Sequence, residues 1–132
     1  MKSSHALHLA LGDAGEKKAA GYLRRRGYRI LAQNVRAGGV ELDLVVRRGT
    51  TLAFVEVKTR RSQRAGAPEL AVDQNKQRRL TQGAHAWLRT HRHLGLCPRF
   101  DVIACQVTGF ETHREKWSIR HFENAFEARE SP

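Results

Sequence analysis

The stretch FVEVKTRR, residues 54–61, carries the strongest structural signal in the chain. It is rich in β-forming residues, and alternate side chains of a strand point to the same face of a sheet. Glu56 and Lys58 therefore share one face, while Val55 and Val57 point to the other. An acid and a base on one face suit a catalytic pocket only if further carboxylates lie nearby. Otherwise they form a solvated surface pair that contributes little to stability.

The totals describe a basic chain. It has 132 residues, 40% of them hydrophobic, and 24 Lys and Arg against 13 Asp and Glu give a formal net charge of +11. We expect a single domain over residues 1–132, with a core over about 12–126 and flexible ends. The charge favours polyanionic partners, with nucleic acid first and an acidic membrane surface second.

Cysteine spacing and hydropathy indicate in which compartment of the cell we expect the protein. The two cysteines lack CxxC spacing, so neither a zinc ribbon nor a disulfide framework is indicated. No apolar stretch approaches the roughly 20 residues of a membrane span, and the N-terminus is a poor signal peptide. We therefore expect a cytoplasmic protein without a membrane partner.

Hydrophobic periodicity and turn residues predict seven elements in the order αβββαββ. The first helix is expected over 13–27 and the second over 73–91, with Asp73 as its cap. The expected strands span 28–35, 40–46, 51–58, 99–107 and 116–122. This order indicates an α/β fold in which a mixed central β-sheet is flanked by helices.

Glu16 in the first expected helix has two interpretations. With Asp13 it has the spacing of a capping box, in which it would only cap the helix. It also precedes Ala19, Ala20 and Leu23 by three, four and seven residues, which places it on the inward face. The sequence leaves a cap and a site residue equally open.

The short loop after VELDLVV, residues 40–46, sets the register of the central hairpin. If Arg47 lies opposite Thr50, Asp43 becomes a diagonal neighbour of Glu56, roughly 7–8 Å away at the backbone. A slip by one residue would move Asp43 to the other face of the sheet.

In that register Glu41 faces Glu56, and three acids crowd beside Lys58. Like charges this close destabilise a fold unless a cation intervenes. A hard divalent ion with oxygen ligands, Mg²⁺ or Mn²⁺, fits that arrangement. The alternative is a solvated polar end of a strand.

These residues resemble a known signature. Asp43, a twelve-residue gap and the run Glu56-Val57-Lys58 resemble the PD-(D/E)xK signature of the restriction-endonuclease-like nucleases. More closely, the chain resembles the YraN-like family of small bacterial proteins. The matching stretches include GEKKAAGYLRRRGYRILAQNVR, GGVELDLVV, FVEVKTR, RFDVI and NAF, and they span roughly residues 12–126. That family is similar in turn to archaeal Holliday-junction resolvases, in which a helix-borne Glu, matched here by Glu16, joins the Asp, Glu and Lys.

The resemblance implies a restriction-endonuclease-like fold and a metal-dependent nuclease that hydrolyses DNA phosphodiester bonds, with branched or flapped DNA as candidate substrates. Asp43, Glu56, the Val57 carbonyl and Glu16 would hold one or two Mg²⁺ or Mn²⁺ ions. Lys58 would lie close to the attacking water. A homodimer would suit a cut in both strands.

Basic side chains cluster beside the strand and the helices that carry the candidate site. Arginines follow the strand that ends at residue 58, arginines end the first helix, at 24–26, and basic residues begin the second helix. Such clusters suit phosphate contacts and predict salt-dependent binding. No recognition-helix or zinc-finger pattern appears, so base-specific readout is not indicated. The residues expected to contact nucleic acid are Arg60, Arg61, Arg64, Lys76 and Arg79.

Three functions are compatible with the sequence. The first is a DNA nuclease of the resolvase type. The second is a nucleic-acid-binding module with a vestigial site that acts with DNA repair or uptake proteins, and the third is a basic RNA-associated protein without a metal. The acid–acid–lysine set favours the first over the third, and nothing separates the first from the second.

Asp101, which interrupts an apolar strand, either supports the site or is a satisfied structural residue.

Overall fold

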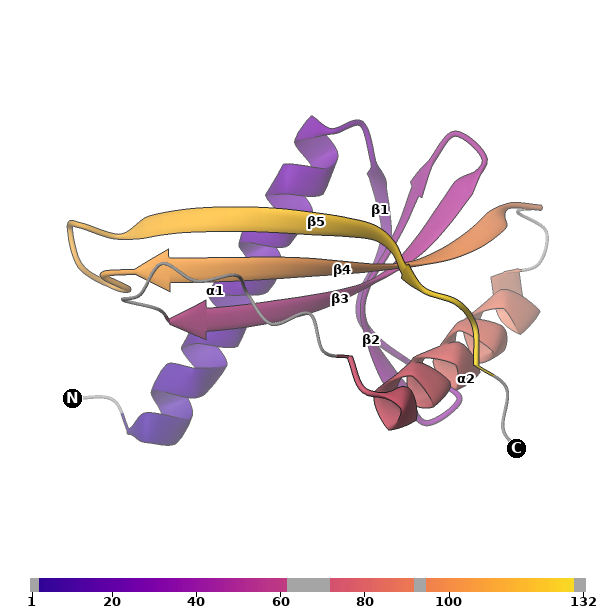
Figure 1. Ribbon diagram of the computed structural model, residues 1–132, viewed down its shortest axis with the longest axis horizontal. Helices are drawn as coiled ribbons and strands as arrows, with labels where there is room; N and C mark the ends of the chain where they lie inside the picture. Colours follow the sequence, from indigo (N-terminus) through magenta and orange to yellow (C-terminus); the bar gives the residue numbers. More distant parts are fainter. Residues whose placement is uncertain (1–2, 62–71, 92–94, 130–132) are drawn as a thin grey trace.

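Two helices and a five-stranded sheet make up the computed structural model, which describes residues 3–61, 72–91 and 95–129 (Figure 1). The helices are α1 (Ser4–Arg25) and α2 (Gln74–His91). The strands are β1 (Arg29–Ala37), β2 (Val40–Arg48), β3 (Thr51–Arg61), β4 (Cys97–Thr108) and β5 (Lys116–Phe126). The predicted element order and the α/β class are confirmed.

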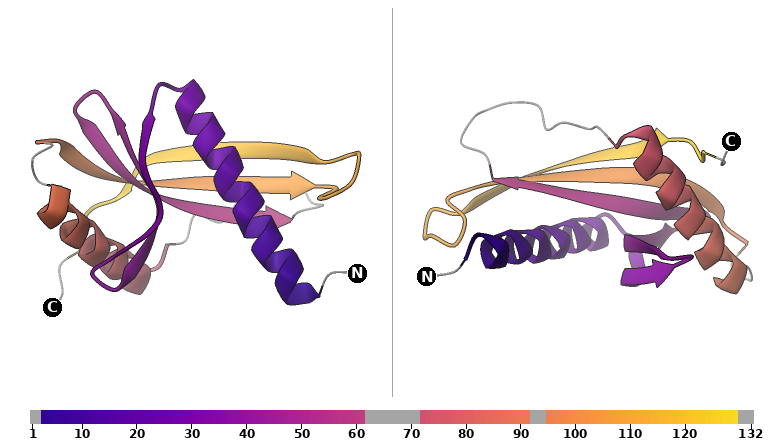
Figure 2. Two further views of the ribbon diagram at one scale, coloured as in Figure 1. Left: turned by 180° about the vertical axis from the view of Figure 1, so that it is seen from behind. Right: turned by 90° about the horizontal axis from the view of Figure 1, so that it is seen from below.

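The sheet is mixed, as the sequence predicted. Its spatial order is β1-β2-β3-β4-β5, and every neighbouring pair is antiparallel except β3 and β4. Those two strands are parallel, and α2 lies between them in the chain, as the connection between parallel strands requires. The sheet is strongly twisted, so that β1 and β2 cross the long strands β3, β4 and β5 at a steep angle (Figures 1 and 2).

Each helix packs on its own face of the sheet. In β3, Leu52 and Phe54 belong to the apolar cluster that contains the buried face of α2, whereas Ala53 and Val55 belong to the cluster beneath α1. Because side chains of a strand alternate between faces, the two clusters lie on opposite sides. Even-numbered residues of β3, Glu56 among them, therefore belong to the α2 side.

The start of α1 differs from the prediction. The helix begins at Ser4, and Ser3 is its N-cap, with its side chain accepting the Ala6 N–H at 3.1 Å. The segment HALHLAL is rich in strong helix formers, so the helix extends about two and a half turns before Asp13. The capping-box interpretation of Asp13 and Glu16 is wrong, because both lie inside the helix.

The other helix ends agree with the sequence. Gly27, at φ 88°, follows the end of α1, and Tyr28 N–H donates to the Leu23 carbonyl at 2.9 Å, which forms a Schellman motif. Asp73 caps α2 by accepting the Lys76 N–H at 2.8 Å. In the parts of the chain that the structure describes, no helix is long and apolar enough to cross a membrane.

The predicted register of β2 and β3 is wrong by two positions. Arg48 pairs with Thr51 and Val45 with Phe54, so the loop is Gly49-Thr50. Gly49 has φ 61°, and the first loop position of a type II′ hairpin favours glycine for this reason. A shift of two leaves the facing of every side chain unchanged.

Candidate functional site

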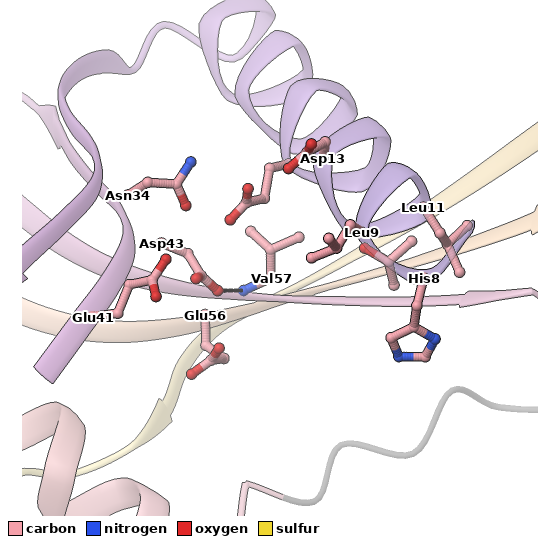
Figure 3. A pocket seen from close by; sticks show the side chains of 12 residues that line it. His8, Leu9, Leu11, Asp13, Asn34, Glu41, Asp43, Glu56 and Val57 are labelled. Carbon is pink, nitrogen blue, oxygen red and sulfur yellow. Dashed lines mark hydrogen bonds between the residues drawn. The ribbon is translucent and has the colours of Figure 1, made fainter. Parts of the chain in front are cut away.

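The candidate site lies where β2 separates from β3. The pairing of these strands ends at Leu44 and Val55. Beyond this point the Asp43 carboxylate accepts the Val57 N–H at 2.9 Å, drawn as a dashed line in Figure 3. The Asp43 carboxylate thus accepts an N–H that the backbone of β2 would accept if the two strands were still paired. This hydrogen bond holds the Asp43 side chain against β3.

Glu56 is the second acid of the site, and its carboxyl group is largely buried. Its side chain is only 12% exposed, and Oε2 accepts no hydrogen bond of ordinary geometry from the residues that the structure describes. Burial, followed by interaction with the neighbouring Asp43 carboxylate, raises the pKa of Glu56 to about 8. The two acids therefore lie close together, as the sequence predicted, although in a different register.

Lys76 is a counter-charge to Glu56. Its Nζ lies 3.5 Å from Glu56 Oε2, and its attraction lowers the Glu56 pKa without overcoming the effects of burial and Asp43. Lys76 comes from the first turn of α2, so the packing of this helix decides the position of the ammonium group.

A cavity of about 400 Å³ opens beside the two acids, between α1 and the strands (Figure 3). We call it the acidic cavity. Such a concentration of carboxylates is unusual in a chain of net charge +11. The acids that line it are Asp13, Glu16, Glu41, Asp43 and Glu56.

Glu16 lines the acidic cavity because α1 lies very close to β3. A Cβ atom at Gly15 would lie 1.9 Å from Thr59 Oγ1, so only glycine permits this packing. Burial and the charge of Asp43 raise the pKa of Glu16, and hydrogen bonding with the Asn34 side chain opposes this rise. Of the two interpretations of Glu16, the structure supports a place in the site rather than a cap.

Asn34 is a residue of the cavity that the sequence analysis missed. It lies within β1 and has φ 49°, a left-handed conformation that Asn tolerates better than most residues. Its side chain lines the acidic cavity with Glu16. An Asn within a strand pattern was the available signal, because Asn is otherwise depleted in strands.

Lys58 lines a second cavity, of about 350 Å³, on the α2 side. We call it the basic cavity. Glu56 and Lys58 are two residues apart in β3 and so share a face, as predicted. Glu56 borders both cavities, whereas Asp43 lines only the acidic one. The acid–acid–lysine set is therefore arranged around Glu56. The basic side chains of this cavity are Lys58, Arg60 and Lys76.

The remaining residues predicted to contact nucleic acid have different positions. Arg60 and Arg61 belong to the end of β3 rather than to a loop. Arg61 and Arg79 are exposed and line neither the acidic nor the basic cavity. Arg64 lies outside the described residues.

The donor set suits a hard cation. Asp43 and Glu56 supply carboxylate oxygens, and Val57 supplies a main-chain carbonyl. Glu56 Oε2 is buried, with the Lys76 ammonium group 3.5 Å away. No group of three or more His, Cys, Asp or Glu side chains in residues 3–61, 72–91 and 95–129 is already spaced to hold a metal ion. Direct ligation by Glu16 thus stays a prediction.

Asp101 belongs to a separate buried network. Its carboxylate, 1% exposed, accepts hydrogen bonds from Arg99 and from His121 at 2.8 Å and from the Asn124 N–H at 3.0 Å. Arg99 also donates to the Tyr28 hydroxyl at 2.8 Å. Asp101 lines neither cavity, so of its two interpretations the structure supports the structural one.

Known proteins resemble this chain over most of its length. The family model of Uncharacterised protein family UPF0102 matches residues 15–105, which include every predicted acid and lysine of the site. A UPF0102 protein of Geobacter metallireducens is 46% identical over 118 residues, covering 89% of this chain and 93% of the relative. A UPF0102 protein of Geobacter sulfurreducens is 48% identical over 117 residues, covering 89% and 88%. The resemblance to the YraN-like family is thereby confirmed, and the chain belongs to the UPF0102 family.

Proposed function

We propose that this chain is a metal-dependent nuclease that hydrolyses DNA phosphodiester bonds, with a restriction-endonuclease-like fold of the PD-(D/E)xK type. The observation that supports it is the adjacent pair of Asp43 and Glu56 carboxyl groups, in which the buried Glu56 Oε2 accepts no hydrogen bond of ordinary geometry from the described residues. A buried carboxyl group whose pKa a neighbouring carboxylate raises suits a divalent cation. The surplus of positive charge in the rest of the chain suits a polyanionic substrate.

Each residue of the site has a distinct part in the proposal. Asp43, Glu56 and the Val57 carbonyl would hold Mg²⁺ or Mn²⁺, and Glu16 lines the same cavity from α1. The cation would supply Lewis-acid activation of the attacking water and of the phosphate. Lys58 lies beside Glu56 in the basic cavity, where its charge stabilises the phosphate as negative charge builds up in the transition state.

Lys76 has a part that depends on the state of Glu56. In the cation-free protein its ammonium group partly neutralises Glu56 at 3.5 Å. A bound cation would favour the ionised form of Glu56. Lys76 and Arg60, which line the basic cavity, would contact a phosphate there.

Cleavage assays test the proposal. Purified protein is incubated with linear, flapped and four-way branched DNA, in Mg²⁺, in Mn²⁺ and in chelator. We expect cation-dependent cleavage that Asp43→Asn and Lys58→Ala each abolish. Glu127→Gln and Lys116→Ala, exposed residues that line neither cavity, are the matched controls. Cleavage that survives both site substitutions would exclude this site.

The same assays separate the second candidate, a nucleic-acid-binding module with a vestigial site. The observation that favours it is the lack, among the described residues, of a ready group of three metal-binding side chains. Tight, salt-sensitive binding with no cleavage in either cation would establish it in place of the nuclease. Equilibrium sedimentation with and without DNA tests the proposed homodimer.

A further inference from the structure

Four arginines surround one corner of the sheet, away from both cavities. We call it the arginine corner: Arg26, Arg29, Arg47 and Arg48. They come from the end of α1, the start of β1 and the end of β2, which meet beside the β2–β3 hairpin (Figure 2). Arg26, Arg29 and Arg48 are exposed and Arg47 is half-buried.

Two of these arginines form a like-charge pair. Arg29 in β1 and Arg47 in β2 are direct cross-strand partners, so their side chains leave the same face side by side. No carboxylate of the described residues forms an ion pair with either of them. A like-charge cross-strand pair destabilises a sheet, and an anion bound between the two guanidinium groups would relieve the repulsion.

The other two arginines lie on the α1 side of this corner, because Arg48 follows Arg47 in β2 and points to the opposite face, and the fold holds them in place. Arg48 Nη1 donates to the Arg26 carbonyl at 3.2 Å, and its guanidinium lies 4.4 Å from the centre of the Tyr28 ring. Arg26 in turn lies over Tyr22. The one described acid that reaches this corner is Glu123, which is 4.0 Å from Arg48 and is shared with Arg99. Guanidinium groups held in this way lose little side-chain entropy when they bind a phosphate.

We infer that the arginine corner is a second docking surface for the phosphate backbone of nucleic acid, distinct from the cavities and independent of any cation. This inference rests on the proposed function for the identity of its ligand. Arg47 lies four residues from Asp43 along β2, about 13 Å at the rise of a strand. That distance corresponds to about four nucleotides of backbone at 3.4 Å each.

The chemistry of the corner favours nucleic acid over an anionic membrane. Binding at a lipid surface combines basic residues with apolar side chains that insert. The exposed large apolar side chain found among the described residues is Leu9, at the opposite end of α1. The arginine corner presents guanidinium groups rather than large apolar side chains, and such groups bind phosphates.

The test compares two double variants that remove equal charge. Arg29→Gln with Arg47→Gln changes the corner. Arg114→Gln with Lys116→Gln changes the β4–β5 connection, at the opposite end of the sheet (Figure 1). Duplex binding is measured in chelator by fluorescence anisotropy over a range of salt, and unfolding by urea is measured beside it.

We expect the corner variant to bind about 10-fold more weakly at moderate salt and its salt slope to fall by about 2, since each lost phosphate contact removes about 0.9. Its stability should be equal or higher, because the like-charge pair is gone. The control variant should keep the wild-type salt slope. The variant Arg29→Lys with Arg47→Lys, which keeps both charges, should have a salt slope close to that of the wild type.

Equal losses in the two Gln variants would mean that net charge alone acts, and would overturn the inference. So would a corner variant that keeps wild-type DNA binding but no longer binds vesicles of anionic lipid. Cation-dependent cleavage by the wild type with no effect of the corner would refute this inference alone. Corner-dependent binding with no cleavage by the wild type would refute the nuclease alone.

Discussion

The Val57 N–H donates to the Asp43 carboxylate at 2.9 Å, at the point where backbone pairing between β2 and β3 has ended. A strand that continues without its neighbour exposes main-chain donors, and here an acidic side chain satisfies one of them. The contact places Asp43 beside Glu56 and thereby creates the buried pair of acids on which the proposed chemistry depends.

Substitutions at Asp43 should separate these two roles. Asp43→Asn keeps an acceptor for the Val57 N–H but removes the charge, so we expect a folded protein that has lost cleavage by about 100-fold or more. Asp43→Ala also removes the acceptor and should lower the free energy of unfolding by about 1–3 kcal/mol. Cleavage rates check the expected loss of activity, and urea unfolding of the same preparations checks the expected loss of stability. Equal stability of the two variants would contradict the structural role.

The pKa of Glu56 predicts how stability depends on pH. Because burial and Asp43 raise this pKa from its ordinary value of 4.5 to about 8, the folded state holds the proton more tightly than the unfolded state. The stabilisation is complete below about pH 4.5 and is lost as the pH rises to about 8, an effect of up to about 5 kcal/mol.

Urea midpoints in chelator at several pH values measure this effect, with Glu56→Gln as the comparison. The variant cannot titrate, so its midpoint should fall less between pH 5 and pH 8. Saturating Mg²⁺ or Mn²⁺ should also reduce the fall in the wild type, because a bound cation favours the ionised form. Parallel curves for the two proteins would show that Glu56 has an ordinary pKa.

Gly15 should be required for the contact between α1 and β3. A methyl group at this position overlaps Thr59 Oγ1, so Gly15→Ala should cost about 1–3 kcal/mol of stability and displace Glu16. Gly12→Ala is the matched control in the same helix, because no atom lies within 4 Å of the added carbon. It should be neutral or stabilising by up to about 1 kcal/mol. Thermal unfolding of both variants measures these changes in stability. A Gly15→Ala variant as stable as the wild type would refute the close packing of α1 on β3.

Asp101 should matter for stability. Asp101→Asn leaves the largely buried charge of Arg99 with only the exposed carboxylate of Glu123, at 3.7 Å, among the described residues, and we expect a loss of about 3–5 kcal/mol. Asp73→Asn is the matched control, since Asn still caps α2 and should have little effect. A loss below 1 kcal/mol in the first variant would contradict the network.

The pH dependence of this contribution has the opposite sign to that of Glu56. Burial opposes ionisation of Asp101, but the hydrogen bonds from His121 and Arg99 outweigh it and lower the Asp101 pKa below its ordinary 3.8. The stabilisation is therefore present above about pH 4 and is lost as the pH falls through the lowered pKa. Acid unfolding curves of the wild type and Asp101→Asn should converge at low pH.

Much of the fold was predictable because it follows from local rules. The alternation of residues 52–58 places Glu56 and Lys58 on one face, Gly27 ends α1, and Asp73 begins α2. The start of α1 was not predicted, because Asp13 and Glu16 have the spacing of a cap while the residues before them also favour a helix. Local signals conflicted there, and continued helix formation prevailed.

The sequence by itself determined the order of the elements and the facing of the side chains in β3, because the period of a strand and the chemistry of caps act over a few residues. Only the tertiary structure decided that Asp43 replaces a missing strand beside Val57, that Asn34 joins Glu16, and that Lys58 belongs to a different cavity from Asp43. These relationships depend on where β2 separates from β3 and how closely α1 packs. Contacts between residues far apart in the chain determine both, and no local pattern encodes them.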